Sequence, residues 1–211
     1  MNSFTPDAYA VAHGATDFAH EMHYTITGRE HMLHAFSTGA YDKKTGLHNE
    51  MIRRAFEFCG LTPDVVRSAI VKVDGPMRPR APHYVHYDPT LQLASTTAVE
   101  TLLMRRIFVS LTPNADIIFK MARDDVGEEN SVHAEDVLRI FLREVDRSEE
   151  AEREHRVMQV IHEAVSGLTL DDIKSAMVES LDVTIAKLQQ ESIRLKHARH
   201  GFMYTGALQG A

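Results

Sequence analysis

The chain has 211 residues, a formal net charge of −7 and 44% hydrophobic residues. This length and apolar content suffice for one domain of moderate size or two small ones. The negative charge argues against broad nucleic-acid binding, which needs a concentrated basic surface. The single cysteine excludes an intrachain disulfide framework, and no apolar run approaches the length of a membrane span. These features predict a cytoplasmic protein with no signal peptide at its amino terminus.

A helix-start signal occurs four times along the sequence. Threonine is followed by proline at Thr5, Thr62 and Thr112, and by leucine in a weaker fourth copy at Thr169. A threonine side chain can cap the free N–H groups at a helix start, and proline suits the first helical position because it has no N–H to satisfy. Each of the four threonines therefore predicts the start of a helix.

The apolar spacing predicts four helices in the first third of the chain. The first helix follows Thr5, the second covers Arg29 to Ser37, the third His48 to Phe58, and the fourth runs from Thr62 to about Val71. The first helix has an apolar face of small residues that permits close packing, formed by Ala8, Val11, Ala12, Ala15 and Ala19.

The same order of elements is predicted again later in the chain. A proline-rich linker and an additional helix, residues 90–108, occupy residues 75–110. Helices are then expected after Thr112, over 133–145, over 155–165 and from Asp171 to at least Glu179. The pattern predicts an all-α fold.

The two sets of helices are related by a nearly constant offset. Thr5 and Thr112 are 107 positions apart (112 − 5), and so are Thr62 and Thr169 (169 − 62). Further pairs share this offset: Ala8 and Ala115, His48 and His155, Met51 and Met158, and Gly60 and Gly167. We interpret the chain as a tandem duplication, with repeat one at 4–74 and repeat two at 111–180. A rival alignment that starts the second repeat at Asp88 loses this offset.

Three short motifs of the first repeat carry a family resemblance. They are Thr5-Pro6-Asp7-Ala8, Gly28-Arg29-Glu30-His31-Met32-Leu33 and Gly60-Leu61-Thr62. The second repeat has the more divergent turn Val132-His133-Ala134-Glu135-Asp136-Val137-Leu138. Because the motifs occur in this order and occur twice, the chain resembles the Clp amino-terminal domain, which is the double helical repeat at the front of Clp-type AAA+ unfoldases.

The resemblance implies a pseudo-twofold domain over residues 1–180 with four helices in each repeat. It also implies a non-enzymatic role, the docking of substrates or adaptor proteins for a Clp-type unfoldase or protease. The chain contains no Gly-x-x-x-x-Gly-Lys-Ser/Thr phosphate-binding loop, so we expect a stand-alone relative whose energy comes from an AAA+ partner. No cofactor is expected.

In some members of that family, each repeat binds phosphoarginine. Carried over to this sequence, the resemblance nominates Thr5 and Glu30 in one site, and Thr112 and Glu135 in the other. A carboxylate can hold a guanidinium group through two contacts, and a helix amino terminus attracts a phosphate. The alternative is that both glutamates only stabilise the first turn of the second helix in their repeat.

Other chemistries find little support in the sequence. His20 and His23, like His31 and His34, are three residues apart and lack the His-Glu-x-x-His spacing of a zinc helix, so no metal site is predicted. Cys59 lies at the predicted end of a helix, which is the poorer end for stabilising a thiolate. We therefore predict no catalytic residue.

The segment 181–211 is predicted to be a carboxyl-terminal helix and tail. Ile185, Leu188 and Leu195 recur at helical spacing, which suits a partner helix or a homodimer seam, or a helix that lies along the domain. Two other functions remain open. The first is a structural or regulatory subunit of a Clp protease or related AAA+ complex, and the second is a small-ligand or modified-arginine sensor unlinked to degradation.

Overall fold

The structure is a computed structural model that describes residues 4–24, 26–41, 45–46, 48–74, 110–127, 129–149 and 156–205. It confirms the all-α prediction, with eight helices in the described residues. The predicted linker and the predicted helix over 90–108 lie outside these ranges. None of the described helices is both long enough and apolar enough to cross a membrane.

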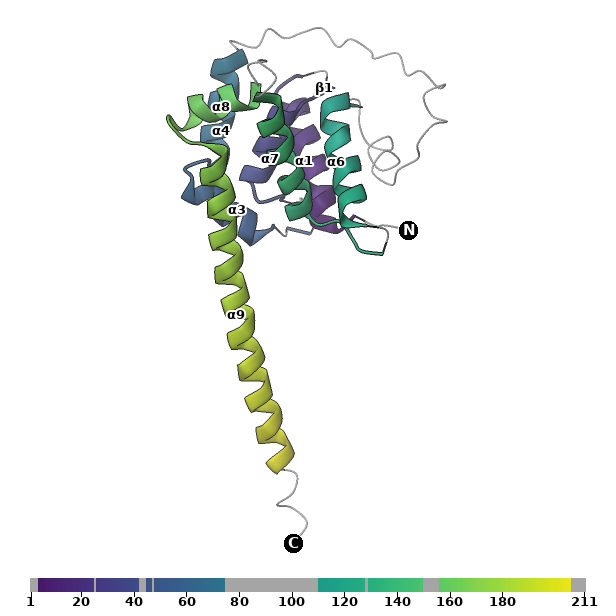
Figure 1. The fold of residues 1–211 in the computed structure, drawn as a ribbon, viewed down its shortest axis with the longest axis vertical. Helices are drawn as coiled ribbons and strands as arrows, with labels where there is room; N and C mark the ends of the chain where they lie inside the picture. The colour runs from purple at the N-terminus through teal and green to yellow at the C-terminus, as the bar shows by residue number, and fades with distance from the viewer. Residues whose placement is uncertain are drawn as a thin grey trace.

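Four helices precede the undescribed segment and four follow it (Figure 1). The first four are α1 (Pro6–Glu21), α2 (Arg29–Ser37), α3 (Glu50–Phe58) and α4 (Pro63–Asp74). The later four are α6 (Pro113–Val126), α7 (Ala134–Glu149), α8 (Arg156–Ala164) and α9 (Leu170–Thr205). Two short strands, β1 (Ile26–Thr27) and β2 (Ser110–Leu111), complete the described elements. We refer to residues 4–74 and 110–205 as the two halves.

The small residues of α1 have the packing role that their spacing predicts. Ala8, Val11, Ala12, Ala15 and Ala19 are all buried. α1 packs on α2, and a Cβ atom added at Gly14 would lie 3.4 Å from the Cβ of Ala35 on the facing helix. The absence of larger side chains on this face therefore lets the two helices approach closely.

The predicted threonine caps differ from one another. Thr112 Oγ1 accepts a hydrogen bond from Ala115 N at 3.2 Å, and Thr169 Oγ1 accepts one from Asp172 N at 3.2 Å, as side-chain caps do. Thr5 is the N-cap residue of α1, as predicted, but its side chain makes no capping hydrogen bond, so that part of the prediction is wrong. Its hydroxyl instead donates to Val132 O at 2.9 Å, in the other half of the molecule.

Two parallel backbone pairings join the halves reciprocally. Phe4, just before α1, forms a bridge with Val132, just before α7. In the second pairing, β2 lies just before α6 and pairs with β1, just before α2. The backbone hydrogen bonds correspond, because Thr5 N donates to Val132 O and Thr112 N donates to Thr27 O, each at 2.9 Å. Each half therefore supplies the partner strand for the other.

The helices of the two halves also pack against each other around one core. α1 contacts α7, α3 contacts α9, and α4 contacts α8. Phe36 of α2 and Phe141 of α7 are fully buried, and their ring centroids are 5.3 Å apart. Phe4 also packs on Phe119 of α6, with centroids 6.1 Å apart. The two halves thus form one folded unit.

α9 runs without a break from Leu170 to Thr205, so the predicted boundary at residue 180 falls inside this helix. Its first part packs on the body, where Ser180 Oγ donates to Met51 O at 2.8 Å. Beyond this contact the helix projects far out from the other helices (Figure 1). The side chains of 185–198 are exposed.

Candidate binding site between the two halves

Three polar side chains meet at the place where α1, α3 and α7 begin. Asn49 is the N-cap of α3, and its Nδ2 atom donates to Asp7 Oδ2 at 3.1 Å and to Glu135 Oε1 at 2.8 Å. Asp7 lies in the first turn of α1, and Glu135 lies in the first turn of α7. A single amide group therefore links carboxylates that belong to different halves.

The orientation of Asn49 is fixed by its capping role. Its Oδ1 atom accepts from Ile52 N at 3.2 Å, so Nδ2 must face away from the helix, toward the carboxylates. Its backbone N–H donates to Gly39 O at 2.6 Å. Gly39 has φ = +71°, and a Cβ atom there would lie 2.9 Å from Asn49 O, so this close approach requires glycine.

Asp7 serves mainly as a structural connector. Its Oδ1 atom accepts from Ala8 N at 3.0 Å and lies beside the Thr5 hydroxyl, whose single proton is shared between Asp7 and Val132 O. Its Oδ2 atom accepts from Ala134 N at 3.4 Å as well as from Asn49. Both oxygens of Asp7 are thus engaged with protein donors. The Asp7 carboxylate takes the place at the start of α1 that a capping hydroxyl would otherwise hold.

Glu135 has one carboxylate oxygen left for a ligand. Its Oε2 atom is buried and has no hydrogen-bond partner in the described structure. The side chain of His133 is exposed, and ligand atoms of Asp7, His133 and Glu135 lie within 4.8 Å of one another. Two carboxylates and an imidazole at this spacing can hold a guanidinium or ammonium group, or a divalent cation. The sequence did not reveal this cluster, because its members come from segments far apart in the chain.

Glu30 occupies a different environment in the other half. Its side chain is 12% exposed, and its Oε1 atom lies 3.8 Å from Arg156 Nε. The guanidinium of Arg156 also pairs with Asp74, which in turn accepts from the Tyr24 hydroxyl. Glu30 therefore already faces a guanidinium group, supplied by the protein itself.

Neither glutamate makes a helix-capping hydrogen bond in the described structure. At the start of α2, Gly28 N donates to His31 Nδ1 at 2.8 Å; at the start of α7, His133 N donates to Asp136 Oδ2 at 3.0 Å. His31 and Asp136 therefore take the capping roles, which leaves Glu30 and Glu135 for other contacts.

Of the four histidines singled out in the sequence, His20 and His23 are exposed, His34 is half-buried, and only His31 belongs to the core. His31 is fully buried, and burial lowers its pKa, so its ring is neutral and the 3.5 Å approach of Nδ1 to Glu30 is not an ion pair. His34 stacks on Phe18 with ring centroids 3.6 Å apart. Burial, assisted by the charge of Arg67, lowers the pKa of His34 to about 4.

Cys59 is buried at the end of α3, and its burial raises the pKa of the thiol to about 11. At neutral pH the thiol is therefore almost entirely protonated and is a weak nucleophile.

The predicted site residues are connected across the halves rather than within them. Thr5 is linked to Glu135 through Asp7 and Asn49. Thr112 N donates to Thr27 O, shortly before Glu30 in the chain, and Arg29 Nε donates to Asn114 O at 3.1 Å. Among the described residues, no hydrogen bond joins Thr5 to Glu30 or Thr112 to Glu135. The structure thus brings together Thr5 with Glu135, and Thr112 with the start of α2.

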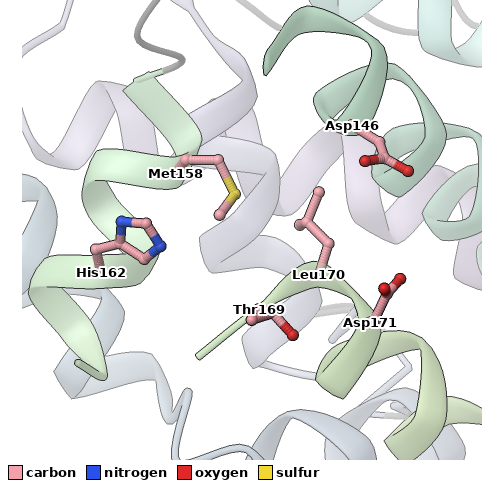
Figure 2. A pocket seen from close by; sticks show the side chains of 6 residues that line it. All are labelled: Asp146, Met158, His162, Thr169, Leu170 and Asp171. Carbon is pink, nitrogen blue, oxygen red and sulfur yellow. The ribbon is translucent and has the colours of Figure 1, made fainter. Parts of the chain in front are cut away.

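A separate shallow pocket of about 210 Å³ lies where α7, α8 and α9 meet. In Figure 2, the His162 ring lies on one side of the pocket and the carboxylates of Asp146 and Asp171 lie on the other, with Met158 and Leu170 between them. Lys174 Nζ already pairs with both carboxylates, at 3.1 and 2.9 Å. Lys174 therefore offsets one of the two negative charges of this pocket.

Neither the models of known protein families nor the curated protein sequences contain a match to this chain.

Proposed function

We propose that this protein is a non-enzymatic docking module of the Clp amino-terminal type, which delivers substrate or adaptor proteins to a Clp-type unfoldase or protease. The reciprocal pairing of the halves is the observation that carries the proposal. Phe4 with Val132, and β2 with β1, are the contacts expected if the chain is a pair of four-helix repeats related by a pseudo-twofold axis.

The helix boundaries give further support. α1 and α6 start 107 positions apart (113 − 6), as do α4 and α9 (170 − 63). The packing of α3 on α9 and of α4 on α8 is likewise reciprocal, because the third helix of each half contacts the fourth helix of the other. Two repeats that pack against each other reciprocally present two related binding places.

The two places differ in charge, and we assign them different ligands. In the first place, the first turn of α6 carries the neutral Asn114, and Arg29 and Arg156 lie near Glu30. A phosphoarginine residue suits this mixture of charges, because Glu30 attracts its guanidinium part while the helix terminus and the arginines attract its phosphate.

In the second place, the first turn of α1 carries the negatively charged Asp7 at the position that Asn114 has in α6. Together with Glu135 it disfavours a phosphate and favours an unmodified arginine or lysine side chain from a docked protein. The unpartnered Oε2 atom of Glu135 is the acceptor for this group.

Calorimetric titration with phosphoarginine and with arginine tests this assignment. We expect Glu30→Gln to abolish the binding of phosphoarginine only, and Glu135→Gln to abolish the binding of arginine only. Glu179→Gln, which changes an exposed glutamate on α9, is the matched control and should bind both ligands normally. No binding of either ligand by the unaltered protein would overturn the assignment of both places.

The docking role itself is tested by purifying the tagged chain from its own cells and identifying the proteins bound to it. An ATP-driven unfoldase or its protease among them supports the proposal. Their absence, in cells where such a machine is present and intact, contradicts it.

A second candidate function is that of a structural or regulatory subunit of the same kind of complex. The projection of α9 from the body is the feature that favours it (Figure 1). Loss of the unfoldase on deletion of residues 181–211, while both ligand titrations stay unchanged, would identify this role.

A further inference from the structure

The projecting part of α9 exposes apolar side chains that the body does not cover. They are 42% to 65% exposed and comprise Val183, Ile185, Leu188, Ile193 and Leu195, and the equally uncovered Val178 precedes the contact of Ser180 with the body. A single exposed apolar residue is ordinary, but a line of them along one helix marks an interaction surface. From Ile185 to Ala198 every side chain of the helix is exposed.

Most of these residues follow a heptad pattern. Val178, the half-buried Leu181, Ile185 and Leu188 alternate in steps of three and four, and Leu195 continues the series one heptad after Leu188. Val178 and Ile185 then occupy position a, and the leucines occupy position d. β-branched residues at a with leucine at d favour two parallel strands.

Ser192 is the one described exception, at position a between Leu188 and Leu195. A small polar residue at a single a position weakens a coiled coil but can fix its register. Val183 and Ile193 are also exposed but lie off the seam, at positions f and b. They provide a natural control for the seam residues.

The charges beside the seam favour a second copy of the same chain in parallel orientation. Glu191 is at position g and Lys196 at position e, five residues later, so they face each other across a parallel in-register dimer. In an antiparallel dimer that aligns the same apolar layers, Glu191 faces Thr184 instead. The hydrogen bond of Glu191 Oε1 with Arg194, at 2.6 Å on the same exposed helix, leaves its second carboxylate oxygen open to a partner.

We propose that two copies of this chain associate through α9 as a parallel two-stranded coiled coil from Val178 to Leu195. The seam is about 27 Å long at 1.5 Å per residue. Because it is short, the dimer should dissociate on dilution, although the contact of Ser180 with Met51 anchors the first turn of the seam to the body. This inference does not depend on the ligand assignment above.

A parallel arrangement places both bodies at the same end of the coiled coil. A partner that binds both copies would then engage the second copy at a raised effective concentration.

Sedimentation analysis of the full chain across a range of concentrations tests the dimer. We expect the unaltered protein to have twice the monomer mass at high concentration, and Leu188→Glu to halve that mass. Ile193→Glu adds the same charge to a similarly exposed position off the seam, and it should remain dimeric. Circular dichroism should show equal helix content in both variants. A monomer at every concentration, or equal disruption by Ile193→Glu, would overturn the proposal.

The orientation is tested by the variant Ser192→Cys. In the parallel dimer the two copies of position 192 lie opposite each other, and mild oxidation should link them by a disulfide. The unaltered chain, whose buried Cys59 has a pKa of about 11, should form no such link and is the control. A dimer that fails to cross-link at position 192 would overturn the parallel arrangement.

The charge pairing is tested by Lys196→Glu, which should weaken the dimer. Adding Glu191→Lys to the same chain should restore it.

Discussion

The carboxylate of Glu30 folds back over Gly28, so that a Cβ atom added at Gly28 would overlap both of its carboxylate oxygens. At the corresponding place in the other half, His133 precedes α7, and Glu135 contacts Asn49 instead. The residue just before α2 or α7, which is Gly28 or His133, therefore affects the direction of the glutamate side chain in the first turn of that helix.

We expect Gly28→Ala to displace Glu30 with little loss of stability. The overlapping atoms are the end of a flexible side chain, and the backbone φ of Gly28 is −95°, which any residue adopts. Urea unfolding should show a change below about 1 kcal/mol, while calorimetry should show weaker phosphoarginine binding. Gly39→Ala is the contrasting variant. It combines φ = +71° with a close contact to Asn49 O and should lose more than about 1 kcal/mol.

Asn49→Ala should destabilise the protein by about 1–3 kcal/mol in urea unfolding. The variant removes the cap of Ile52 N and leaves the carboxylates of Asp7 and Glu135 without their shared donor. Asn49→Asp separates the two effects, since it keeps the capping oxygen but adds a third negative charge. If Asn49→Asp were as stable as the unaltered protein, the bridging amide would have no energetic role.

Glu135→Gln is expected to stabilise the fold by about 1 kcal/mol, although it should abolish arginine binding. The amide keeps the acceptor for Asn49 and removes a charge whose Oε2 atom is buried without a partner. Thermal unfolding of the variant beside Glu179→Gln measures the difference. A lower melting temperature for Glu135→Gln would show that Oε2 is satisfied in solution.

Stability should fall as the pH drops from about 6.5 toward 4, through His34. Its pKa is lowered from 6.5 in the unfolded chain to about 4 in the fold, chiefly by burial, so the unfolded state binds more protons in this window. The loss should be of the order of 2 kcal/mol and complete below the folded pKa. His34→Phe keeps the stacking on Phe18 and removes the titration, so its urea midpoint should change less across this range. Because burial also lowers the pKa of His31, some dependence on pH should remain.

Cys59 should react slowly with thiol reagents in the folded protein at neutral pH. Its thiol is buried, and its raised pKa of about 11 leaves almost no thiolate. Alkylation followed by mass spectrometry should show modification only when urea unfolds the chain. Rapid labelling without urea would indicate that the contact between α3 and α9 opens readily.

The local features of the fold were the most predictable from the sequence. α2 has the predicted bounds, because the apolar spacing and the glycine before Arg29 are local signals. The role of Thr5 could not be predicted in this way. Its hydroxyl can cap α1 or donate to a carbonyl 127 positions away, and only the packed molecule decides between these.

The candidate site was predictable only in part. The resemblance to the Clp amino-terminal domain only nominated Glu30 and Glu135, and the link of Thr5 to Glu135 arises because the halves pair their backbones reciprocally. Asn49 could have been recognised from its sequence as a cap. Its second role, as a donor to Asp7 and Glu135, depends on contacts across 42 and 86 positions.

The exchange of strand partners also has a consequence for how the protein folds during synthesis. Thr5 is translated early, yet its backbone N–H and hydroxyl are satisfied by Val132, which is made much later. The first half therefore leaves the ribosome before the backbone partner of Phe4 and Thr5 has been made. It can complete its hydrogen bonding only when most of the chain has emerged, so it needs protection from unsuitable partners until then.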